Sequence, residues 1–598
     1  MGEARRILRD VFGFPDFRPG QEEVVRAVLA GEDVLAVMPT GGGKSLCYQL
    51  PALVRGGLTI VVSPLIALMR DQVAQLKRNG VEAGSLNSTN DSAENARVAD
   101  AVRGGRMRLL YASPERLTAN GVADWLARSG VSLLAIDEAH CVSQWGHDFR
   151  PEYAQLGEVR RRLGNVQAIA LTATADVSTR GDIVGRLFET EPRVFIQGFD
   201  RPNLRLAMTP KENTTRQLKD FLARHRHESG IVYCASRNAT DRLAARLAQG
   251  GVRSLPYHAG MSPAERSRNQ DEFLQEDVVM VATVAFGMGI DKPDVRFVAH
   301  AALPKSIEAY YQEIGRAGRD GAPADTLTLY GMDDLRLRRL QIEDSDASEE
   351  QKRVERQRLN ALVALCEAPR CRRQTLLAYF GENAEPCGNC DLCIEGVSSF
   401  DGTVEAQKLL SAMARTGERF GTEHLVSLLL GEETEAIRRF GHHQLKTFGV
   451  GRDRPKNEWR SLLRQIYAAG LTEMDVESFG RWLITERGGA VLKGEERIAL
   501  RADVLRPRER RRRGAAAPND AGVSADDPLL QALKALRTKL AREEGVPAYV
   551  IFSDRSLIDL AAKRPQTRVD FRAVHGVGEA KLQRYGATFL SVVQEHQA

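Results

Sequence analysis

Met38-Pro39-Thr40-Gly41-Gly42-Gly43-Lys44-Ser45 is the stretch of this 598-residue sequence that decides its fold. It lies between the apolar run Val34 to Val37 and the segment Leu46 to Leu50, an order that predicts a strand, a glycine turn and a helix. In such a turn the backbone N–H groups of successive glycines can surround an anion. Lys44 can then reach the outer phosphates of a nucleotide, and Ser45 offers a hydroxyl to Mg2+. Met38 stands where the general phosphate-loop pattern has a glycine, so a chance glycine-rich turn is the alternative.

The composition is that of a large protein without a membrane span. At 598 residues we expect about four folded units. The content is 43% hydrophobic and 27% charged, and the sequence has no apolar run of roughly 18 residues, the length that a bilayer requires. The first residues do not resemble a signal peptide, so we expect a cytoplasmic protein. A net charge of +5 permits a polyanionic partner without establishing one.

Apolar strands alternate with helical patterns after the glycine turn, which predicts a parallel sheet covered on both faces. The expected strands are 59–63, 109–112, 133–136 and 168–171. Ligands of such sheets gather at the carboxyl ends of the strands, and the third of these strands leads directly into Asp137-Glu138-Ala139-His140. Asp137 is then placed to hold Mg2+, through water, opposite Ser45. Glu138 is placed to orient or deprotonate the water that attacks the γ-phosphate.

The segment before the glycine turn, residues 12–21, offers groups that could bind the adenine of ATP. The amide of Gln21 can pair with adenine as donor and acceptor, and the planes of Phe14 and Arg18 can stack on it. A packed N-terminal turn is the alternative. The expected nucleotide-binding residues are Phe14, Arg18, Gln21, Thr40, Gly41, Gly42, Gly43, Lys44, Ser45 and Asp137.

Three motifs in this order resemble the signature of superfamily 2 helicases, and the residues around them resemble the RecQ family. The motifs are the glycine turn, residues 137–140 and Thr172-Ala173-Thr174-Ala175. The most diagnostic flank is Cys141-Val142-Ser143-Gln144-Trp145-Gly146-His147-Asp148-Phe149-Arg150-Pro151-Glu152-Tyr153. It is similar to the aromatic-rich loop through which RecQ enzymes couple DNA contact to ATP hydrolysis. The resemblance covers residues 8–598 and is least specific over 400–525.

The aromatic-rich loop provides candidate DNA contacts, which are Gln144, Trp145, His147, Phe149 and Arg150. The two aromatic rings can stack on unpaired bases, worth about 1–3 kcal/mol each, and His147 and Arg150 can provide polar and phosphate contacts. Burial of both rings is the alternative. Gly146 and the dense polar neighbours favour an exposed loop.

A second series of strands and helices begins after the proline-punctuated segment 198–203. Its expected strands are 231–234, 254–257, 278–282 and 296–299. Residues 310–321 are expected on a helix that presents Arg316 and Arg319 on one face, as fingers toward the transferring phosphoryl group. With Gln312 they resemble the sixth motif of the family. The expected catalytic residues are Lys44, Asp137, Glu138, Gln312, Arg316 and Arg319, and their place on two lobes predicts that ATP closes the cleft between them.

Four cysteines in the pattern C-x15-C-x2-C-x2-C predict a metal site. Cys371, Cys387, Cys390 and Cys393 suit a closed, structural Zn2+ site with four thiolates. An iron–sulfur centre is the alternative. The neighbouring Arg370, Arg372 and Arg373 could touch DNA or be solvated helix charges.

The rest of the sequence resembles the C-terminal part of bacterial family members. Residues 401–503 predict helices followed by a hairpin, with strands at 482–485 and 490–492 joined by Gly488-Gly489, which is similar to the family's winged helix. A helical domain with a structural role is the alternative. An arginine-rich tether precedes a segment that resembles the HRDC domain. There, His575-Gly576-Val577-Gly578 could direct N–H groups to a DNA phosphate.

We therefore expect an α/β protein with two tandem RecA-like parallel-sheet lobes, a helical zinc-binding subdomain, a winged helix and a small all-α HRDC domain. The expected boundaries are 1–200, 201–340, 341–399, 400–503, a flexible linker at 504–525, and 526–598. The resemblance implies a monomeric, nucleoid-associated 3'-5' DNA helicase that uses ATP, Mg2+ and Zn2+ in recombination and repair. Its partners would be single-stranded and duplex DNA, a single-strand-binding protein and other repair factors. The rival interpretations are an RNA helicase and a DNA-binding scaffold without turnover.

Overall fold

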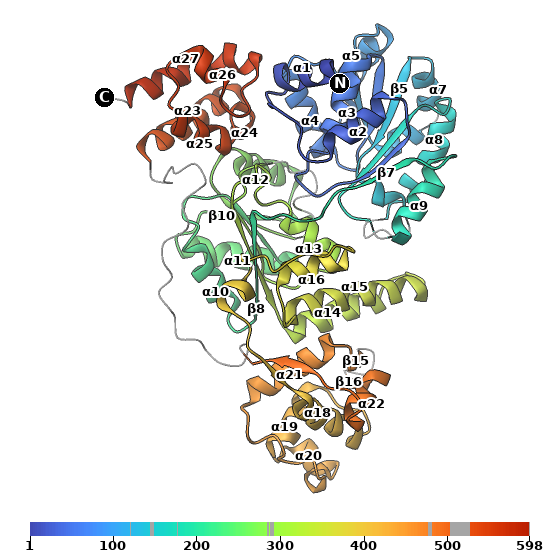
Figure 1. Cartoon of the computed structure of the whole chain (residues 1–598), viewed down its shortest axis with the longest axis vertical. Helices are drawn as coiled ribbons and strands as arrows, with labels where there is room; N and C mark the ends of the chain where they lie inside the picture. The colour runs from blue at the N-terminus through green and yellow to red at the C-terminus, as the bar shows by residue number, and fades with distance from the viewer. Residues whose placement is uncertain are drawn as a thin grey trace.

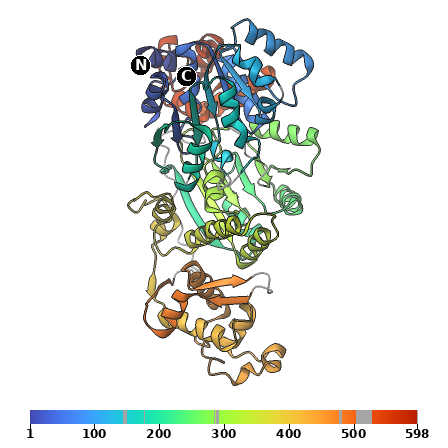
Figure 2. The same ribbon diagram turned by 90° about the vertical axis from the view of Figure 1, so that its right-hand side faces the viewer.

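The structure is a computed structural model that describes residues 1–119, 121–143, 149–175, 177–283, 286, 292–475, 481–502 and 527–596. Figures 1 and 2 show an elongated molecule in which residues 399–502 lie at one end. Residues 527–596, drawn in red, lie at the other end beside the N-terminal elements drawn in blue. None of the helices in these ranges is long and apolar enough to cross a bilayer.

The first lobe is a seven-stranded parallel sheet in the order β3-β4-β2-β5-β6-β1-β7. Its strands are β1 (Val34–Val37), β2 (Leu58–Val62), β3 (Ala83–Leu86), β4 (Leu109–Ala112), β5 (Val131–Ile136), β6 (Ala168–Thr172) and β7 (Arg193–Ile196). The helices include α1 (Gly2–Asp10), α2 (Gln21–Leu29), α3 (Leu46–Arg55), α4 (Ile66–Arg78), α5 (Ser92–Arg103), α6 (Pro114–Thr118), α7 (Val122–Ala127), α8 (Leu156–Arg162) and α9 (Val177–Leu187). Strands β1, β2, β4 and β6 are buried throughout, as expected for a parallel sheet covered on both faces.

The second lobe is a six-stranded parallel sheet in the order β10-β11-β9-β12-β13-β8. Its strands are β8 (Leu204–Pro210), β9 (Gly230–Tyr233), β10 (Ser254–Tyr257), β11 (Val279–Ala282), β12 (Phe297–His300) and β13 (Ala324–Tyr330). The accompanying helices include α10 (Thr214–Leu222), α11 (Arg237–Gln249), α12 (Pro263–Gln275), α13 (Ile307–Ile314) and α14 (Met332–Glu343). The predicted pair of parallel-sheet lobes is therefore confirmed.

Four strands of the two sheets, β3, β7, β8 and β13, escaped the sequence analysis. Strand β3 reads Ala-Gly-Ser-Leu and lacks β-branched residues, while β7 is an edge strand whose side chains are mostly exposed. Strands β8 and β13 carry a charged residue inside the strand, Arg205 and Asp325 respectively. Short buried apolar runs are a strong signal for central strands, whereas edge and charged strands lack it.

The region that follows the lobes is mostly helical. It contains α15 (Glu349–Glu367), α16 (Arg372–Tyr379), α17 (Asp391–Glu395), α18 (Thr403–Arg415), α19 (Thr422–Leu430), α20 (Glu435–Arg439), α21 (Lys456–Ala468) and α22 (Glu486–Lys493). Two antiparallel strand pairs lie among these helices. They join β14 (Ser399–Asp401) to β17 (Ala499–Arg501) and β15 (Thr472–Asp475) to β16 (Arg481–Ile484).

The expected hairpin turn at Gly488-Gly489 is wrong. Both glycines lie inside α22, which begins after the cap Thr485, whose side chain accepts a hydrogen bond from the N–H of Gly488. A Cβ atom on Gly488 would lie 2.1 Å from the carbonyl oxygen of Leu471. Glycine serves close packing at this position, and the antiparallel partner of β16 precedes it in the sequence.

Residues 527–596 form the C-terminal helical region. It contains α23 (Pro528–Glu544), α24 (Ala548–Ile551), α25 (Asp554–Lys563), α26 (Arg568–Arg572) and α27 (Glu579–Glu595). These helices enclose their own core, in which the ring of Phe552 contacts those of Phe571, Tyr585 and Phe589. The predicted all-α module is therefore present, with a hydrophobic core of its own.

Candidate functional site

A cavity of about 510 Å3 lies where the two lobes meet. Nearly all the nucleotide-binding and catalytic residues expected from the sequence line it. They are Phe14, Arg18, Gln21, Thr40, Gly41, Gly43, Lys44, Ser45, Asp137 and Glu138 from the first lobe and Gln312, Arg316 and Arg319 from the second. Gly42 belongs to the same turn and accepts a hydrogen bond from Gln21 through its carbonyl oxygen.

The glycine turn follows β1 and precedes α3, in the order expected for a phosphate loop. Gly41 and Gly43 have positive φ angles of 76° and 78°, which direct the chain around the space that an anion would occupy. The Lys44 ammonium lies 3.3 Å from the carbonyl oxygen of Met38 and 3.4 Å from that of Pro39. Burial lowers the pKa of Lys44, while the nearby carboxylates of Glu138 and Asp137 oppose this shift.

The side chain of Gln21 holds the glycine turn in place through hydrogen bonds. Its side-chain amide donates to the carbonyl oxygens of Gly42 and Gly43, at 3.2 and 3.0 Å, and its Oε1 accepts from the backbone N–H of Arg18 at 2.8 Å. An adenine contact through Gln21 would have to exchange these hydrogen bonds. No local sequence pattern indicates this supporting role, because the role depends on how the glycine turn folds back onto the start of α2.

The acidic pair Asp137 and Glu138 extends from the carboxyl end of β5. Glu138 adopts a left-handed conformation with φ of 49°, and its backbone N–H donates to Oδ1 of Asp137 at 3.0 Å. His140 connects this pair to the 172–175 motif, since its Nδ1 lies 2.9 Å from Oγ1 of Thr172 and 3.4 Å from Oε2 of Glu138. Burial lowers the pKa of His140 to about 3, so the imidazole is neutral at physiological pH.

Arg316 and Arg319 reach the cavity from a turn; the expected helix over 310–321 is confirmed only to Ile314, and its continuation through the two arginines is wrong. Helix α13 ends at Ile314, and Gly315 follows as its C-cap. Gly318 then takes a positive φ of 55°, which turns the chain sharply. A Cβ on Gly315 would lie 1.8 Å from Oγ1 of Thr40, so the absence of a side chain lets the second lobe approach the phosphate loop closely.

The C-terminal helical region forms a third wall of the same cavity, which the sequence analysis did not predict. It contributes Tyr549, Ser553, Arg555, Ser556, His575, Gly576 and Lys581. Arg555 donates to the carbonyl oxygen of Asp320, 2.9 Å away in the turn after Arg319. The ring of His575 lies 6.1 Å from that of Phe14, and burial lowers the pKa of His575 to about 4.

Ion pairs attach the C-terminal helical region to both lobes. Arg537 lies 2.7 Å from Asp554 within the region and 4.0 Å from Asp294 of the second lobe. Arg542 pairs with Glu276 of the second lobe, and Arg572 lies 3.5 Å from Asp10 of the first. No local sequence pattern could have indicated this docking, because every partner is distant in the chain.

The segment 575–578 lies against the first lobe, contrary to the expected DNA-phosphate contact. The backbone N–H of His575 donates to Asp559 at 2.8 Å, and Gly578 packs on Gly13. The N–H of Val577 donates to the carbonyl oxygen of Val574 at 3.3 Å, so two of the N–H groups proposed for DNA are engaged within the protein.

The aromatic-rich loop is described only in part. Gln144, Trp145 and His147 lie outside the described residues. Phe149 is 36% exposed, which contradicts the burial alternative for this ring. Arg150 donates to the carbonyl oxygen of Pro64 at 3.1 Å and thereby ties the end of the loop to the segment that precedes α4.

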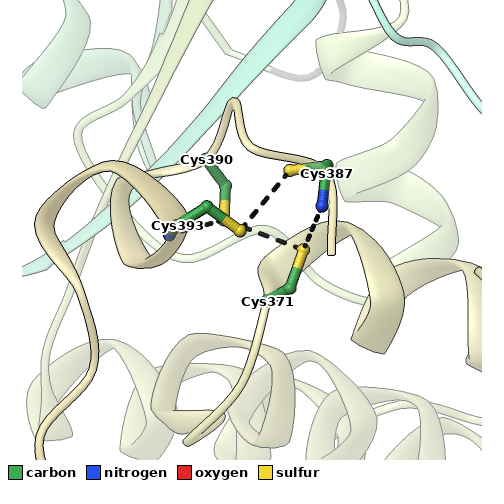
Figure 3. Close-up of side chains that lie close together, drawn as sticks. All are labelled: Cys371, Cys387, Cys390 and Cys393. Atoms are coloured by element: carbon green, nitrogen blue, oxygen red, sulfur yellow. Dashed lines mark hydrogen bonds between the residues drawn. The ribbon is translucent and has the colours of Figure 1, made fainter. Parts of the chain in front are cut away.

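Four cysteine side chains converge as predicted for a metal centre (Figure 3). The Sγ atoms of Cys371, Cys387, Cys390 and Cys393 lie within 4.8 Å of one another, and two of the separations are 3.9 and 4.0 Å. A tetrahedral ion with Zn–S bonds of about 2.3 Å would place sulfur atoms about 3.8 Å apart. A multi-iron cluster would hold the four thiolates farther apart, because each would bind a different iron. The geometry therefore fits a single zinc ion.

Arg372 and Arg373 are buried, so both roles expected for them are wrong. Arg372 donates to the carbonyl oxygens of Leu365 and Cys366 at 2.7 and 2.6 Å and pairs with Asp391 at 3.1 Å. Arg373 lies 3.3 Å from Asp200 and donates to the carbonyl oxygen of Leu204. These side chains join the zinc-binding region to the second lobe. Arg370 remains exposed.

Family models match most of the chain in the order of these structural units. DEAD/DEAH box helicase matches residues 18–183, Helicase conserved C-terminal domain 213–321, RecQ zinc-binding 332–394, RQC domain 396–509 and HRDC domain 526–593. Among curated proteins, "ATP-dependent DNA helicase RecQ" of Haemophilus influenzae is 42% identical over 100% of the chain and 96% of that protein. The protein of the same name from Bacillus subtilis is 38% identical over 99% of the chain and 98% of that protein. A solved structure of "DEAD-box helicase Mss116 bound to ssRNA and UDP-BeF" aligns with a TM-score of 0.47 and 18% identity, over 59% of this chain and 80% of the other.

Proposed function

The chain belongs to the RecQ family and is an ATP-dependent DNA helicase, and we propose that it cleaves ATP in the cavity shared by its two lobes. The observation that carries this proposal is that Lys44 of the first lobe and Arg319 of the second line one cavity. Hydrolysis would then require both lobes to contact the same ATP molecule. Each cycle of closure and release of the cleft would move single-stranded DNA by a step. The family resemblance implies 3'-5' movement.

The cavity residues of the two lobes have proposed roles. Phe14, Arg18 and Gln21 hold the base, and the glycine turn with Lys44 holds the phosphates. Mg2+ would be held by Ser45 and Asp137, and it would neutralise charge on the phosphate oxygens. Glu138 orients the attacking water and receives its proton. Arg316 and Arg319, beside Gln312, stabilise the charge that develops on the transferring phosphoryl group.

Neutral His140 has a positioning role in this scheme. Its contacts with Thr172 and Glu138 connect the end of β6 to the residue that activates water. Arg150 ties the aromatic-rich loop to Pro64 on the same side of the first lobe. The backbone N–H of Arg150 also donates to the carbonyl oxygen of Cys141, the residue after His140, at 3.0 Å. A change in the loop on DNA binding would therefore reach His140 and Glu138 through this contact.

We propose the domain boundaries given above and a place for the protein at the nucleoid, in recombination, repair and replication-fork maintenance. Single-stranded and duplex DNA are the proposed substrates. A single-strand-binding protein and other repair factors are the proposed partners of a monomeric enzyme.

A comparison of nucleic-acid cofactors tests this function against an RNA helicase and an inactive scaffold. Steady-state ATP hydrolysis is measured with no polymer, with single-stranded DNA and with single-stranded RNA of equal length. We expect strong stimulation by DNA and displacement of a duplex that carries a 3' overhang. Stronger stimulation by RNA would favour the RNA helicase, and absence of turnover with either polymer would favour the scaffold.

A further inference from the structure

Arg201 lies in the segment that joins the two sheets, between the end of β7 at Ile196 and the start of β8 at Leu204. Its guanidinium contacts loops of both lobes. Nη1 donates to the carbonyl oxygen of Thr40 at 2.5 Å and to that of Gly315 at 3.3 Å. Nη2 donates to the carbonyl oxygens of Ala317 and Gly318, each at 2.9 Å. One side chain thus bridges the phosphate loop and the turn that carries Arg316 and Arg319.

The segment around Arg201 is fixed to the second lobe and the zinc-binding region. Asn203 donates to the carbonyl oxygens of Gly318 and Ala322, both at 2.9 Å. The ring of Phe199 stacks on that of Phe380 with centroids 4.4 Å apart, and its carbonyl oxygen accepts from the hydroxyl of Tyr311 at 3.0 Å. The segment is therefore fixed to the second lobe, and the guanidinium of Arg201 extends from it to Thr40.

The electrostatic setting of Arg201 is unusual for a guanidinium that is largely enclosed. Burial lowers its pKa to about 10, Tyr311 and Asp320 oppose this shift, and the nearby cations Arg319 and Arg18 add to it. Within the described ranges no carboxylate oxygen lies within 4.0 Å of it, so backbone carbonyls are its partners. Enclosing a cation without a directly paired carboxylate is costly.

We propose that Arg201 is a positioning residue for ATP hydrolysis, which holds the phosphate loop against the turn that carries Arg316 and Arg319. The inference rests on the proposed ATP site and adds a residue that does not touch the nucleotide. Its planar fork is required, because two nitrogen atoms must serve carbonyl groups on two separate loops at once. A lysine keeps the charge but offers a single nitrogen, so it can retain only part of the bridge.

The geometry separates binding of ATP from its cleavage. Lys44 and the glycine turn belong to the first lobe, so ATP can still bind when the bridge is lost. The arginines of the second lobe would no longer be held at the phosphates. A displacement of about 1 Å can cost roughly 100-fold in rate, and arginine fingers contribute on the order of 1,000-fold or more. The expected signature is therefore a fall in kcat with little change in KM for ATP.

The test compares Arg201→Met and Arg201→Lys with the wild-type enzyme at saturating single-stranded DNA. For Arg201→Met we expect kcat to fall about 10- to 100-fold, while KM for ATP changes by less than roughly threefold. Arg201→Lys should recover part of the lost kcat. A fluorescent ADP analogue should bind both variants as it binds the wild type.

Arg160→Met is the matched control, because Arg160 is also a buried arginine that donates to backbone carbonyls. Its carbonyl partners are Val166 at 2.9 Å and Leu187 at 3.0 Å, and it also pairs with Asp33 at 2.6 Å, all within the first lobe. This variant should lose thermal stability but keep kcat per folded molecule. The double variant Arg201→Met/Arg319→Met should be no slower than Arg319→Met alone, because both changes remove the same contribution.

Two results would overturn the inference. One is a kcat of Arg201→Met, per folded molecule, that matches that of Arg160→Met. The other is a KM for ATP that rises in proportion to the loss of activity, which would make Arg201 a nucleotide ligand. A wild-type enzyme that hydrolyses no ATP with single-stranded DNA would instead overturn the ATP site itself, so the two failures are distinguishable.

Discussion

Gly315 of the second lobe lies so close to Thr40 of the first that a Cβ atom at residue 315 would come within 1.8 Å of the threonine Oγ1. The residue has φ of −63° and ψ of −9°, a conformation open to any amino acid. The requirement for glycine at this point therefore concerns the approach of the lobes and not the backbone.

Gly315→Ala should consequently separate the phosphate loop from the arginine turn with little loss of stability. We expect the DNA-stimulated rate of ATP hydrolysis to fall about tenfold or more, because the methyl group displaces one catalytic surface from the other. Gly185→Ala in α9 is the control, since its Cβ would meet nothing within 4 Å and alanine favours a helix. Equal activity of the two variants would show that the lobes do not meet at Thr40 during catalysis.

Lys44→Ala should abolish ATP hydrolysis and unwinding while binding of single-stranded DNA is retained. The ammonium lies in the phosphate loop, and the candidate DNA contacts lie elsewhere. Hydrolysis is measured by phosphate release and DNA binding by fluorescence anisotropy. Lys539→Ala, which removes an exposed amine from α23, should behave as the wild type. Unwinding by Lys44→Ala would disprove the role of this lysine.

Cys390→Ser should remove about one zinc ion per chain and destabilise the zinc-binding region, because four thiolates surround the proposed ion. Metal content is measured by elemental analysis after dialysis. Cys234→Ser changes a buried cysteine in the second lobe, outside the cluster, and should leave the zinc content unchanged. Iron-dependent absorbance in the wild-type protein would contradict the assignment.

Arg555→Ala should accelerate release of ADP. The guanidinium hydrogen-bonds to Asp320 and holds the C-terminal helical region over the cavity. A hydrogen bond worth roughly 0.5–1.5 kcal/mol predicts that the off-rate rises about two- to tenfold. Stopped-flow release of a fluorescent ADP analogue measures this rate. Arg584→Ala breaks an ion pair within the helical region itself and should have no effect. An unchanged off-rate in Arg555→Ala would mean that this wall does not retain nucleotide.

His140 should contribute to the loss of stability in acid. Burial lowers its folded-state pKa to about 3, below the value of about 6.5 in an unfolded chain. The unfolded state therefore binds more protons between pH 6.5 and pH 3, and stability falls as the pH is lowered through this window. The drop in Tm between pH 7 and pH 5 should be smaller for His140→Asn than for the wild type. An equal drop would show that this imidazole is not held neutral.

The sequence predicted the parts of the site whose residues are adjacent in the chain. The glycine turn, the Asp137-Glu138 pair and the cysteine pattern each combine their chemistry with a local turn or strand end, so their positions followed from the motif alone. Arg319 was assigned to the cavity by resemblance, but its helix was wrong because Gly315 and Gly318 end α13 early. The sequence pattern could not reveal that Thr40, about 275 residues away, leaves no space for a side chain at Gly315.

Tertiary placement was beyond the reach of the sequence. Arg372 looked like a surface cation until the fold surrounded it with carbonyl oxygens and Asp391. Arg201 carries no chemical signature in the sequence, because it is an arginine before a proline in a loop. The docking of the C-terminal helical region depends on ion pairs such as Arg572 with Asp10, which no local pattern connects.

The packing of Gly578 on Gly13, together with the ion pair of Arg572 with Asp10, holds the C-terminal helical region against the N-terminal segment. If the molecule were stretched between handles attached near residues 2 and 596 in an optical trap, we expect this contact to open first, while both sheets stay intact. Its opening force should rise when the cavity holds nucleotide, since the same helices cover that ligand. The force at which this contact opens would thus measure whether nucleotide is bound, although neither handle is attached to a residue of the cavity.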